Sequence, residues 1–213
     1  MPKNTFLNLP IEMQEKIILE AIKEFANKGY EKGNVGEIAK NSTVSKGSMY
    51  QYFENKKELY IFTLKKAVEI STHDIEKVCD DLNGIDIYEY IYKAFKGAWP
   101  LLKKQREIFV LLRNVNFESN IEIKKELSNI ILKTSETVFL KIIEDNKLRG
   151  FIRNDIDSKL ILIYVDGISF KFKSYMLEIA TNKDKDLLET DFLEYEQLII
   201  DMINLIKNGI WIK

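Results

Sequence analysis

Hydrophobic residues recur at three- and four-residue spacing along most of the chain, which is the period of one face of an α-helix. Between residues 17 and 25, for example, Ile17, Ile18, Ala21, Ile22 and Phe25 follow this spacing. The 213 residues include only 3 prolines and 9 glycines, which is few for a sandwich or barrel with its frequent turns. The pattern therefore predicts an all-α protein.

Capping residues divide the N-terminal part of the chain into helices. Pro10 suits the first turn of a helix, and Asn8 precedes it as a candidate cap. Gly29 is expected to end this helix, because glycine readily adopts a positive φ. Asn34 and Ser45 each precede a short helix in the position of an N-cap. The predicted helices cover Pro10–Gly29, a short segment after Asn34, Lys46–Phe53 and Lys56–Cys79.

The rest of the chain is predicted to form further helices. Asp86 and Asp157 are candidate caps, and Gly150 is a candidate stop signal. The helices expected there cover residues 86–100, 101–113, 121–147, 158–180 and 189–207.

Two short helices joined by a tight turn and packed on a longer helix form a helix-turn-helix. In the second short helix, at about 100° per residue, Met49 and Phe53 lie on one face and are expected to be buried. The opposite face then carries small and amide side chains flanked by two tyrosines: Gly47, Ser48 and Gln51, with Tyr50 and Tyr52.

Side chains of these types fit the base edges and phosphates of a DNA duplex. The Gln51 amide can pair with adenine, and the Ser48 hydroxyl can bond to several base edges. Gly47 lets the backbone approach closely. Tyrosine hydroxyls on the flanks are placed to meet phosphates. The candidate DNA-contacting residues are Asn34, Ser45, Lys46, Gly47, Ser48, Tyr50, Gln51, Tyr52 and Lys56.

The charge balance requires such binding to come from a local patch. With 32 lysines and arginines against 33 acids, the formal net charge is -1, which argues against a wholly basic coat. Between Lys40 and Lys57, however, four lysines and one glutamate leave a net charge of +3. Binding through this patch is expected to weaken with salt, but less steeply than for a strongly basic protein.

The segment Lys16–Tyr60 resembles the DNA-binding domain of the tetracycline-repressor-like (TetR) family of bacterial transcriptional regulators. The resemblance rests on Ile18-x-x-Ala21-x-x-x-Phe25-x-x-x-Gly29-Tyr30, then Val35-x-x-Ile38-Ala39, then Val44-Ser45-Lys46-Gly47-Ser48-Met49-Tyr50-Gln51-Tyr52-Phe53-x-x-Lys56-x-x-Leu59. It implies a homodimer that binds a double-stranded DNA operator, with one recognition helix per subunit in successive major grooves. It also implies base contacts from Lys46, Gly47, Ser48 and Gln51, and phosphate contacts from Asn34, Tyr50, Tyr52 and Lys56.

One departure from the family pattern lies in the turn between the short helices. Ser42-Thr43 stands where the family usually has Ala-Gly. A β-branched threonine at a position that prefers a positive φ is expected to be strained by about 1 kcal/mol or more.

Aromatic residues are dense after residue 85, where they form either an ordinary core or part of a cavity for a small apolar or aromatic effector. The candidate ligand residues are Trp99, Phe109, Phe117 and Tyr164, with His73 as a polar anchor. The sequence has one histidine and one cysteine, which argues against a tetrahedral zinc site. It also lacks a Gly-rich phosphate loop and a nucleophile elbow. We therefore expect no metal, no cofactor and no enzymatic activity.

The last predicted helix carries more apolar positions than one buried stripe requires. With the preceding helix it would form half of a four-helix bundle between two subunits, or else pack only within its own core. The candidate dimer residues are Phe170, Tyr195, Ile199, Met202 and Ile206. We thus expect residues 1–58 to form a helix-turn-helix DNA-binding domain and residues 59–213 a larger effector-binding and dimerisation domain.

The sequence as a whole predicts a cytoplasmic, ligand-responsive transcriptional regulator, and the family resemblance favours a repressor. The alternative is a helical dimer that binds small molecules or proteins without sequence-specific DNA binding. The longest apolar run, residues 160–165, is far shorter than the about 20 residues needed to cross a membrane, so no membrane partner is expected. The fourth helix, which begins at Lys56, is expected to transmit effector binding to the DNA-binding domain.

Overall fold

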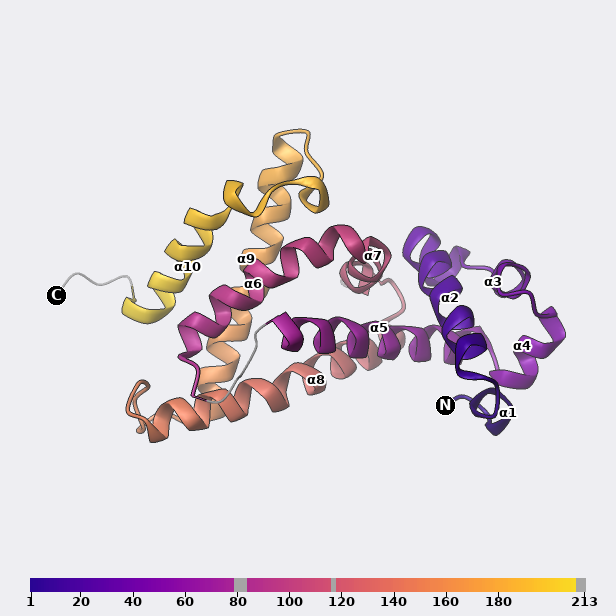
Figure 1. Ribbon diagram of the computed structural model, residues 1–213, viewed down its shortest axis with the longest axis horizontal. Helices are drawn as coiled ribbons and strands as arrows, with labels where there is room; N and C mark the ends of the chain where they lie inside the picture. The colour runs from indigo at the N-terminus through magenta and orange to yellow at the C-terminus, as the bar shows by residue number, and fades with distance from the viewer. Residues whose placement is uncertain (79–83, 116–117, 210–213) are drawn as a thin grey trace. The chain divides into compact units, whose positions relative to one another are not determined.

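The computed structural model describes residues 1–78, 84–115 and 118–209, and these ranges contain helices and no strand (Figure 1). The prediction of an all-α protein is confirmed. The helices are α1 (Asn4–Leu7), α2 (Ile11–Lys32), α3 (Val35–Asn41), α4 (Lys46–Tyr52), α5 (Lys56–Val78), α6 (Ile87–Lys104), α7 (Arg106–Asn114), α8 (Ile121–Leu148), α9 (Ser158–Asn182) and α10 (Glu196–Asn208), with 3-10 turns η2 (Leu187–Glu189) and η3 (Phe192–Glu194).

The chain divides into two compact units. Unit 1 comprises Met1–Thr72 with Gln105–Thr134, and unit 2 comprises His73–Lys104 with Ser135–Lys213. The long helices α5 and α8 each contribute residues to both units. The predicted boundary between a DNA-binding domain (residues 1–58) and an effector-binding and dimerisation domain (residues 59–213) is defined by function, and it stays a prediction. The compact units themselves group α7 and the first part of α8 with the N-terminal helices.

The core of unit 1 forms around the predicted apolar face of α2. Ile17, Ala21 and Phe25 on this face are fully buried. Helix α7 packs along α2, and the Asn114 side chain donates a hydrogen bond to the Ala26 carbonyl at 3.0 Å. The apolar spacing read from the sequence thus marks the buried side of α2.

Tyr60 of α5 joins the same core. Its ring lies 4.8 Å from that of Phe25. Burial, together with the nearby Glu118 carboxylate, raises the pKa of the Tyr60 phenol above its usual value.

Four of the predicted N-caps are confirmed by hydrogen bonds, including Asp86, which accepts from the Tyr88 N–H at 2.7 Å at the start of α6. The Asn34 side chain accepts from the Gly36 N–H at 2.8 Å, and Ser45 Oγ accepts from the Ser48 N–H at 2.9 Å. Asp157 accepts from the Lys159 N–H at 2.9 Å at the start of α9. Each side chain satisfies a backbone donor that the first turn of its helix leaves free.

Other expected boundaries were wrong or incomplete. Asn8 does not cap α2; it follows α1, a short helix that the sequence pattern did not predict. Gly29 has the predicted positive φ, at 67°, and its non-helical backbone interrupts α2 there, but a further helical segment follows it to Lys32. Helix α6 runs through Pro100 to Lys104, although a proline inside a helix removes one backbone hydrogen bond.

The last expected helix is also shorter than predicted. The Asp186 and Asp191 carboxylates accept hydrogen bonds from the N–H groups of Leu188 and Leu193, both at 3.0 Å. These bonds cap η2 and η3, so that α10 begins only at Glu196.

Unit 2 is built from α6, α9, α10 and the second half of α8. Trp99 lies at its centre, with ring centroids 5.6 Å from Phe192 and 5.5 Å from Tyr195. The buried Asn146 of α8 binds the start of α6: its side chain accepts from the Ile87 N–H at 3.0 Å and donates to the Ile85 carbonyl at 2.8 Å. Among the described helices, none combines the length and the apolar character that spanning a membrane requires.

Candidate nucleic-acid interface

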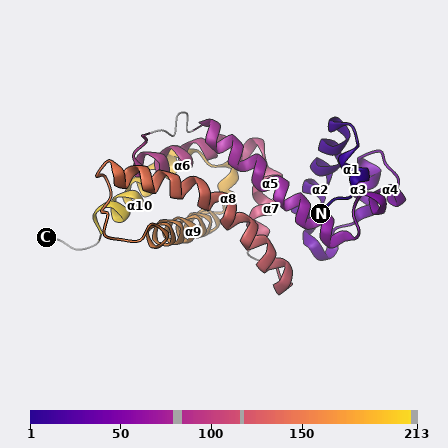
Figure 2. The same cartoon turned by 90° about the horizontal axis from the view of Figure 1, so that it is seen from below.

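Helices α3 and α4 form the helix-turn-helix of unit 1. Helix α3 packs on both α2 and α4, and residues 42–45 connect the two short helices. Helix α4 lies along an outer edge of unit 1 in both views (Figures 1 and 2). This arrangement leaves one side of the second short helix open to a binding partner.

The two faces of α4 agree with the orientation predicted from the sequence. Met49 is 1% exposed and Phe53 is 2% exposed, and both belong to the core of unit 1. On the opposite side Gly47 and Gln51 are exposed and Ser48 is half-buried. The polar groups expected to read bases are therefore accessible.

The turn contains the strained residue that the sequence predicts. Thr43 has a φ of 61°, in the left-handed region that disfavours β-branched side chains. Its hydroxyl donates to the Ser42 carbonyl at 2.6 Å and accepts from Lys16 Nζ at 3.1 Å. Ser42 is fully buried, and its Oγ has no hydrogen-bond partner among the described residues.

The strain at Thr43 leads to a stability prediction. Thr43→Gly should be more stable than Thr43→Ala by about 1 kcal/mol, because both lose the hydroxyl and only glycine relieves the left-handed backbone. Urea unfolding of the two variants measures the difference. The same pair of substitutions at Lys40, inside α3, should show the opposite order. Equal stability of the two Thr43 variants would contradict a strained turn.

Comparison with known proteins places this helix-turn-helix in a family. The sequence profile described as "Bacterial regulatory proteins, tetR family" matches residues 17–61, which comprise most of α2, all of α3 and α4, and the start of α5. The chain belongs to the TetR family of bacterial regulatory proteins. As a TetR-family protein it is a DNA-binding transcriptional regulator and not an enzyme.

Relatives of this TetR-family chain agree with that assignment. It is 26% identical over 179 residues to IcaR, the negative transcriptional regulator of a biofilm operon in Staphylococcus epidermidis, covering 82% of this chain and 94% of IcaR. It is 27% identical over 126 residues to the HTH-type transcriptional regulator YerO of Bacillus subtilis, covering 59% of this chain but only 44% of YerO. The crystal structure of FadR from Bacillus subtilis in complex with stearoyl-CoA has the same fold, with a TM-score of 0.70, 23% identity and coverage of 92% and 99% of the two chains.

Several of the expected DNA-contacting residues of the TetR-family chain also make contacts within the protein. Ser45 and Ser48 share a hydrogen bond between their hydroxyls at 2.8 Å, in addition to the capping bond. Tyr52 is half-buried, with its ring 6.1 Å from that of Phe6 in an edge-on contact. Tyr50 is 44% exposed. Of the two tyrosines, Tyr50 is therefore the better placed to reach a phosphate.

Lys56 stabilises the end of α2 rather than pointing freely outward. Its Nζ donates to the carbonyls of Glu31 and Gly33, at 3.1 and 3.3 Å, and lies 4.8 Å from the centre of the Tyr30 ring. The side chains of Asn34 and Lys46 are both exposed to solvent, and the Asn34 side chain also accepts the capping bond from the Gly36 N–H.

The expected ligand residues are distributed over both units. His73 and Tyr164 are exposed in unit 2, and Phe109 is half-buried in unit 1. Trp99 is 5% exposed, and its indole N–H donates to the Thr190 carbonyl at 2.9 Å, so its polar group already has a partner inside the core. Phe117 lies outside the described residues. Within the described ranges, no group of three potential metal ligands comes together.

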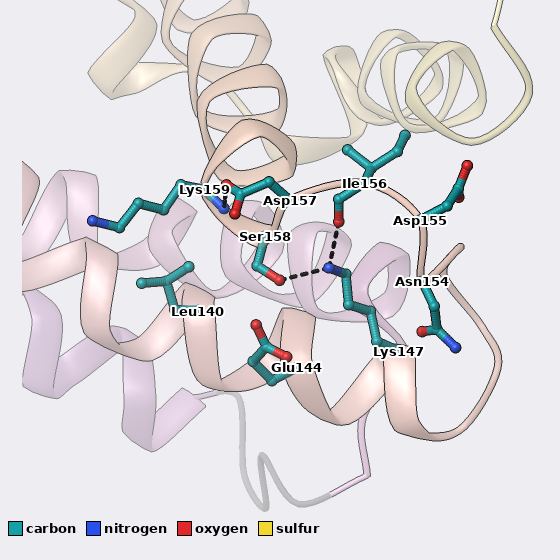
Figure 3. Close-up of a pocket in the computed structure, with 9 residues that line it drawn as sticks. All are labelled: Leu140, Glu144, Lys147, Asn154, Asp155, Ile156, Asp157, Ser158 and Lys159. Atoms are coloured by element: carbon teal, nitrogen blue, oxygen red, sulfur yellow. Dashed lines mark hydrogen bonds between the residues drawn. The ribbon is translucent and has the colours of Figure 1, made fainter.

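A hollow of about 520 Å³ lies between the end of α8 and the start of α9 (Figure 3). Its lining is mostly polar or charged, and Lys147 Nζ already donates to the Ile156 carbonyl and the Ser158 hydroxyl there. Of the expected ligand residues, the four that the structure describes, namely His73, Trp99, Phe109 and Tyr164, do not line this hollow. It therefore differs in character from the apolar effector cavity that the sequence predicts.

The expected dimer residues fall into two groups. Tyr195, Ile199 and Met202 are at most 4% exposed and pack within unit 2, which agrees with the alternative of packing within their own core. Their role at a dimer surface stays a prediction. Ile206 is half-buried against the same core. Phe170 of α9 is 53% exposed and stays a candidate.

Two features of the fold were missed by the sequence pattern. The first is α1, whose Phe6 is buried against the end of α4. The second is the exposed apolar face of α9. Three apolar residues before Pro10 (Phe6, Leu7 and Leu9) were the signal that could have indicated a packed N-terminal segment.

Proposed function

We propose that this chain is a ligand-responsive transcriptional repressor that binds a pseudo-palindromic operator as a homodimer in the cytoplasm. The observation that supports the proposal most directly is the outward face of α4. On the inner side of this segment Met49 and Phe53 are buried, whereas on the outer side Gln51, Gly47 and Lys46 are exposed. The DNA major groove is wide enough to admit an α-helix that presents an exposed polar face of this kind.

Repression is favoured by IcaR, a negative regulator to which most of the chain aligns. A small-molecule effector with an apolar part is favoured by FadR, whose structure holds stearoyl-CoA in the same fold. Helix α5 provides the connection, because it begins at Lys56 in unit 1 and continues past His73 in unit 2. An effector that prefers one arrangement of α5 would change operator affinity, and a coupling of about 1–3 kcal/mol is typical.

The homodimer is supported by α9. Leu160, Ile163 and Phe170 are more than half exposed, although each is strongly apolar. Gly167 lies between them in the helical repeat, and a side chain there would meet no atom within 4 Å. A stripe of this kind allows close approach of a second helix, and a dimer would supply the two recognition helices that two half-sites about 34 Å apart require.

The function predicts a base-specific effect at Gln51. Gln51→Ala should reduce discrimination at one base position by about 1–3 kcal/mol and leave the other positions unchanged. Tyr50→Phe, by contrast, should weaken binding about equally for all sequences, since a phosphate contact carries no sequence information. Titration of each variant against single-base variants of the upstream duplex, at two salt concentrations, measures both effects.

Gln197→Ala is the matched control, because Gln197 is an exposed glutamine of α10 in unit 2. It should bind with the wild-type base profile. An unchanged profile for Gln51→Ala would show that another surface reads the bases. A wild-type protein with no sequence preference and no salt dependence would instead support the helical dimer that binds small molecules or proteins.

A further inference from the structure

The recognition helix α4 ends against residues from the start of the chain. An α-helix leaves its last four carbonyl groups without partners inside the helix. In α4, the Met49 carbonyl accepts from the Phe53 N–H at 2.9 Å. The next three accept from the N-terminal segment: Lys3 Nζ donates to the Tyr50 carbonyl (3.0 Å), Thr5 Oγ1 to the Gln51 carbonyl (2.5 Å) and Lys3 N to the Tyr52 carbonyl (2.9 Å). Every carbonyl at this end of α4 therefore has a donor.

A buried aromatic ring anchors the same segment. Phe6 is 1% exposed, and its ring centroid lies 4.9 Å from that of Phe53 and 5.6 Å from that of Phe62. Because Phe53 follows α4 and Phe62 belongs to α5, the ring of Phe6 joins the two helices. We call residues 3–6 the N-terminal clasp.

The clasp matters because α4 is short. A helix of seven residues is not stable by itself, and its geometry comes from tertiary contacts. Tyr50 and Gln51 belong to its last turn, so the direction of both side chains depends on the backbone that the clasp holds. The Lys3 ammonium also compensates the partial negative charge at the end of the helix.

We propose that the N-terminal clasp positions the last turn of the recognition helix and thereby sets base discrimination by Gln51. This inference rests on the proposed function of α4 as the DNA-reading helix. Thr5 and Phe6 are positioning residues in this scheme, since they act on the base-reading side chain through the backbone of α4. The clasp requires no contact of its own with DNA.

Thr5→Val tests the clasp, because it removes the donor to the Gln51 carbonyl and keeps the shape of the side chain. We expect operator affinity to fall roughly fivefold, the size of one lost hydrogen bond, with most of the loss at the base read by Gln51. Amide hydrogen exchange of residues 50–53 should become faster. Thr5→Ser, which restores the hydroxyl, should recover the base profile and slow exchange. Phe6→Leu should give a partial loss of both.

Asn4→Ala is the control within the clasp, since Asn4 is exposed and its side chain makes no hydrogen bond among the described residues. It should behave as wild type. Thr5→Val with unchanged affinity, base profile and exchange would overturn the proposal. If wild type shows no operator preference, the proposed function fails separately, and the exchange of residues 50–53 alone decides whether the clasp holds α4.

Discussion

Replacing Ile163 by glutamate should convert the regulator into a monomer and lower operator affinity by more than about 100-fold. Ile163 is 66% exposed on α9, in the stripe that also contains Leu160, Gly167 and Phe170. A carboxylate there would have to be buried against a second copy of the same apolar stripe, at a high desolvation cost. Loss of the second recognition helix removes the bivalent gain in affinity, which is typically about 100- to 10,000-fold. Analytical ultracentrifugation and operator titration measure the two effects together.

Leu193→Glu is the matched control, because Leu193 is 73% exposed in η3 and lies outside α9. It should leave both mass and affinity unchanged. A dimeric Ile163→Glu variant with wild-type affinity would show that the subunits associate through another surface.

Asn146→Ala should lower the free energy of unfolding by about 3 kcal/mol, since three hydrogen bonds of a fully buried side chain are lost. The substitution leaves the Ile87 N–H and the Ile85 carbonyl without their partner at the start of α6. For a chain of 213 residues, this loss corresponds to a fall in Tm of about 6–12 °C. Thermal unfolding followed by circular dichroism measures the shift.

Asn154→Ala provides the comparison, because Asn154 is an exposed asparagine between α8 and α9. Its Tm should stay within about 2 °C of wild type, as for most surface substitutions. A similar Tm for both variants would mean that Asn146 does not hold the start of α6.

Local sequence signals predicted most of the helices. The caps at Asn34, Ser45 and Asp157 act within three residues of their own position, so a single sequence contains the whole interaction. The buried side of α4 follows from the four-residue spacing of Met49 and Phe53 for the same reason. Both signals depend only on helical geometry.

Contacts between distant parts of the chain bury several residues whose role the periodicity left open. Trp99, a candidate for the ligand cavity, donates its indole N–H to the Thr190 carbonyl, 91 residues later. Tyr195 and Ile199, candidates for a dimer surface, pack in the core around Trp99. Apolar side chains at a core and at an interface have the same composition and spacing, so periodicity alone does not separate them.

The amino-acid sequence by itself determined the helical class, the short recognition helix with its inward pair Met49 and Phe53, and the left-handed turn at Thr43. All of these depend on neighbours within one or two turns. Only the tertiary structure decided that Lys56 binds the end of α2, that the N-terminal clasp closes the end of α4, and that α9 keeps an exposed apolar stripe. Each of these depends on which distant backbone groups and surfaces meet, and that choice is made by the packing of the whole fold.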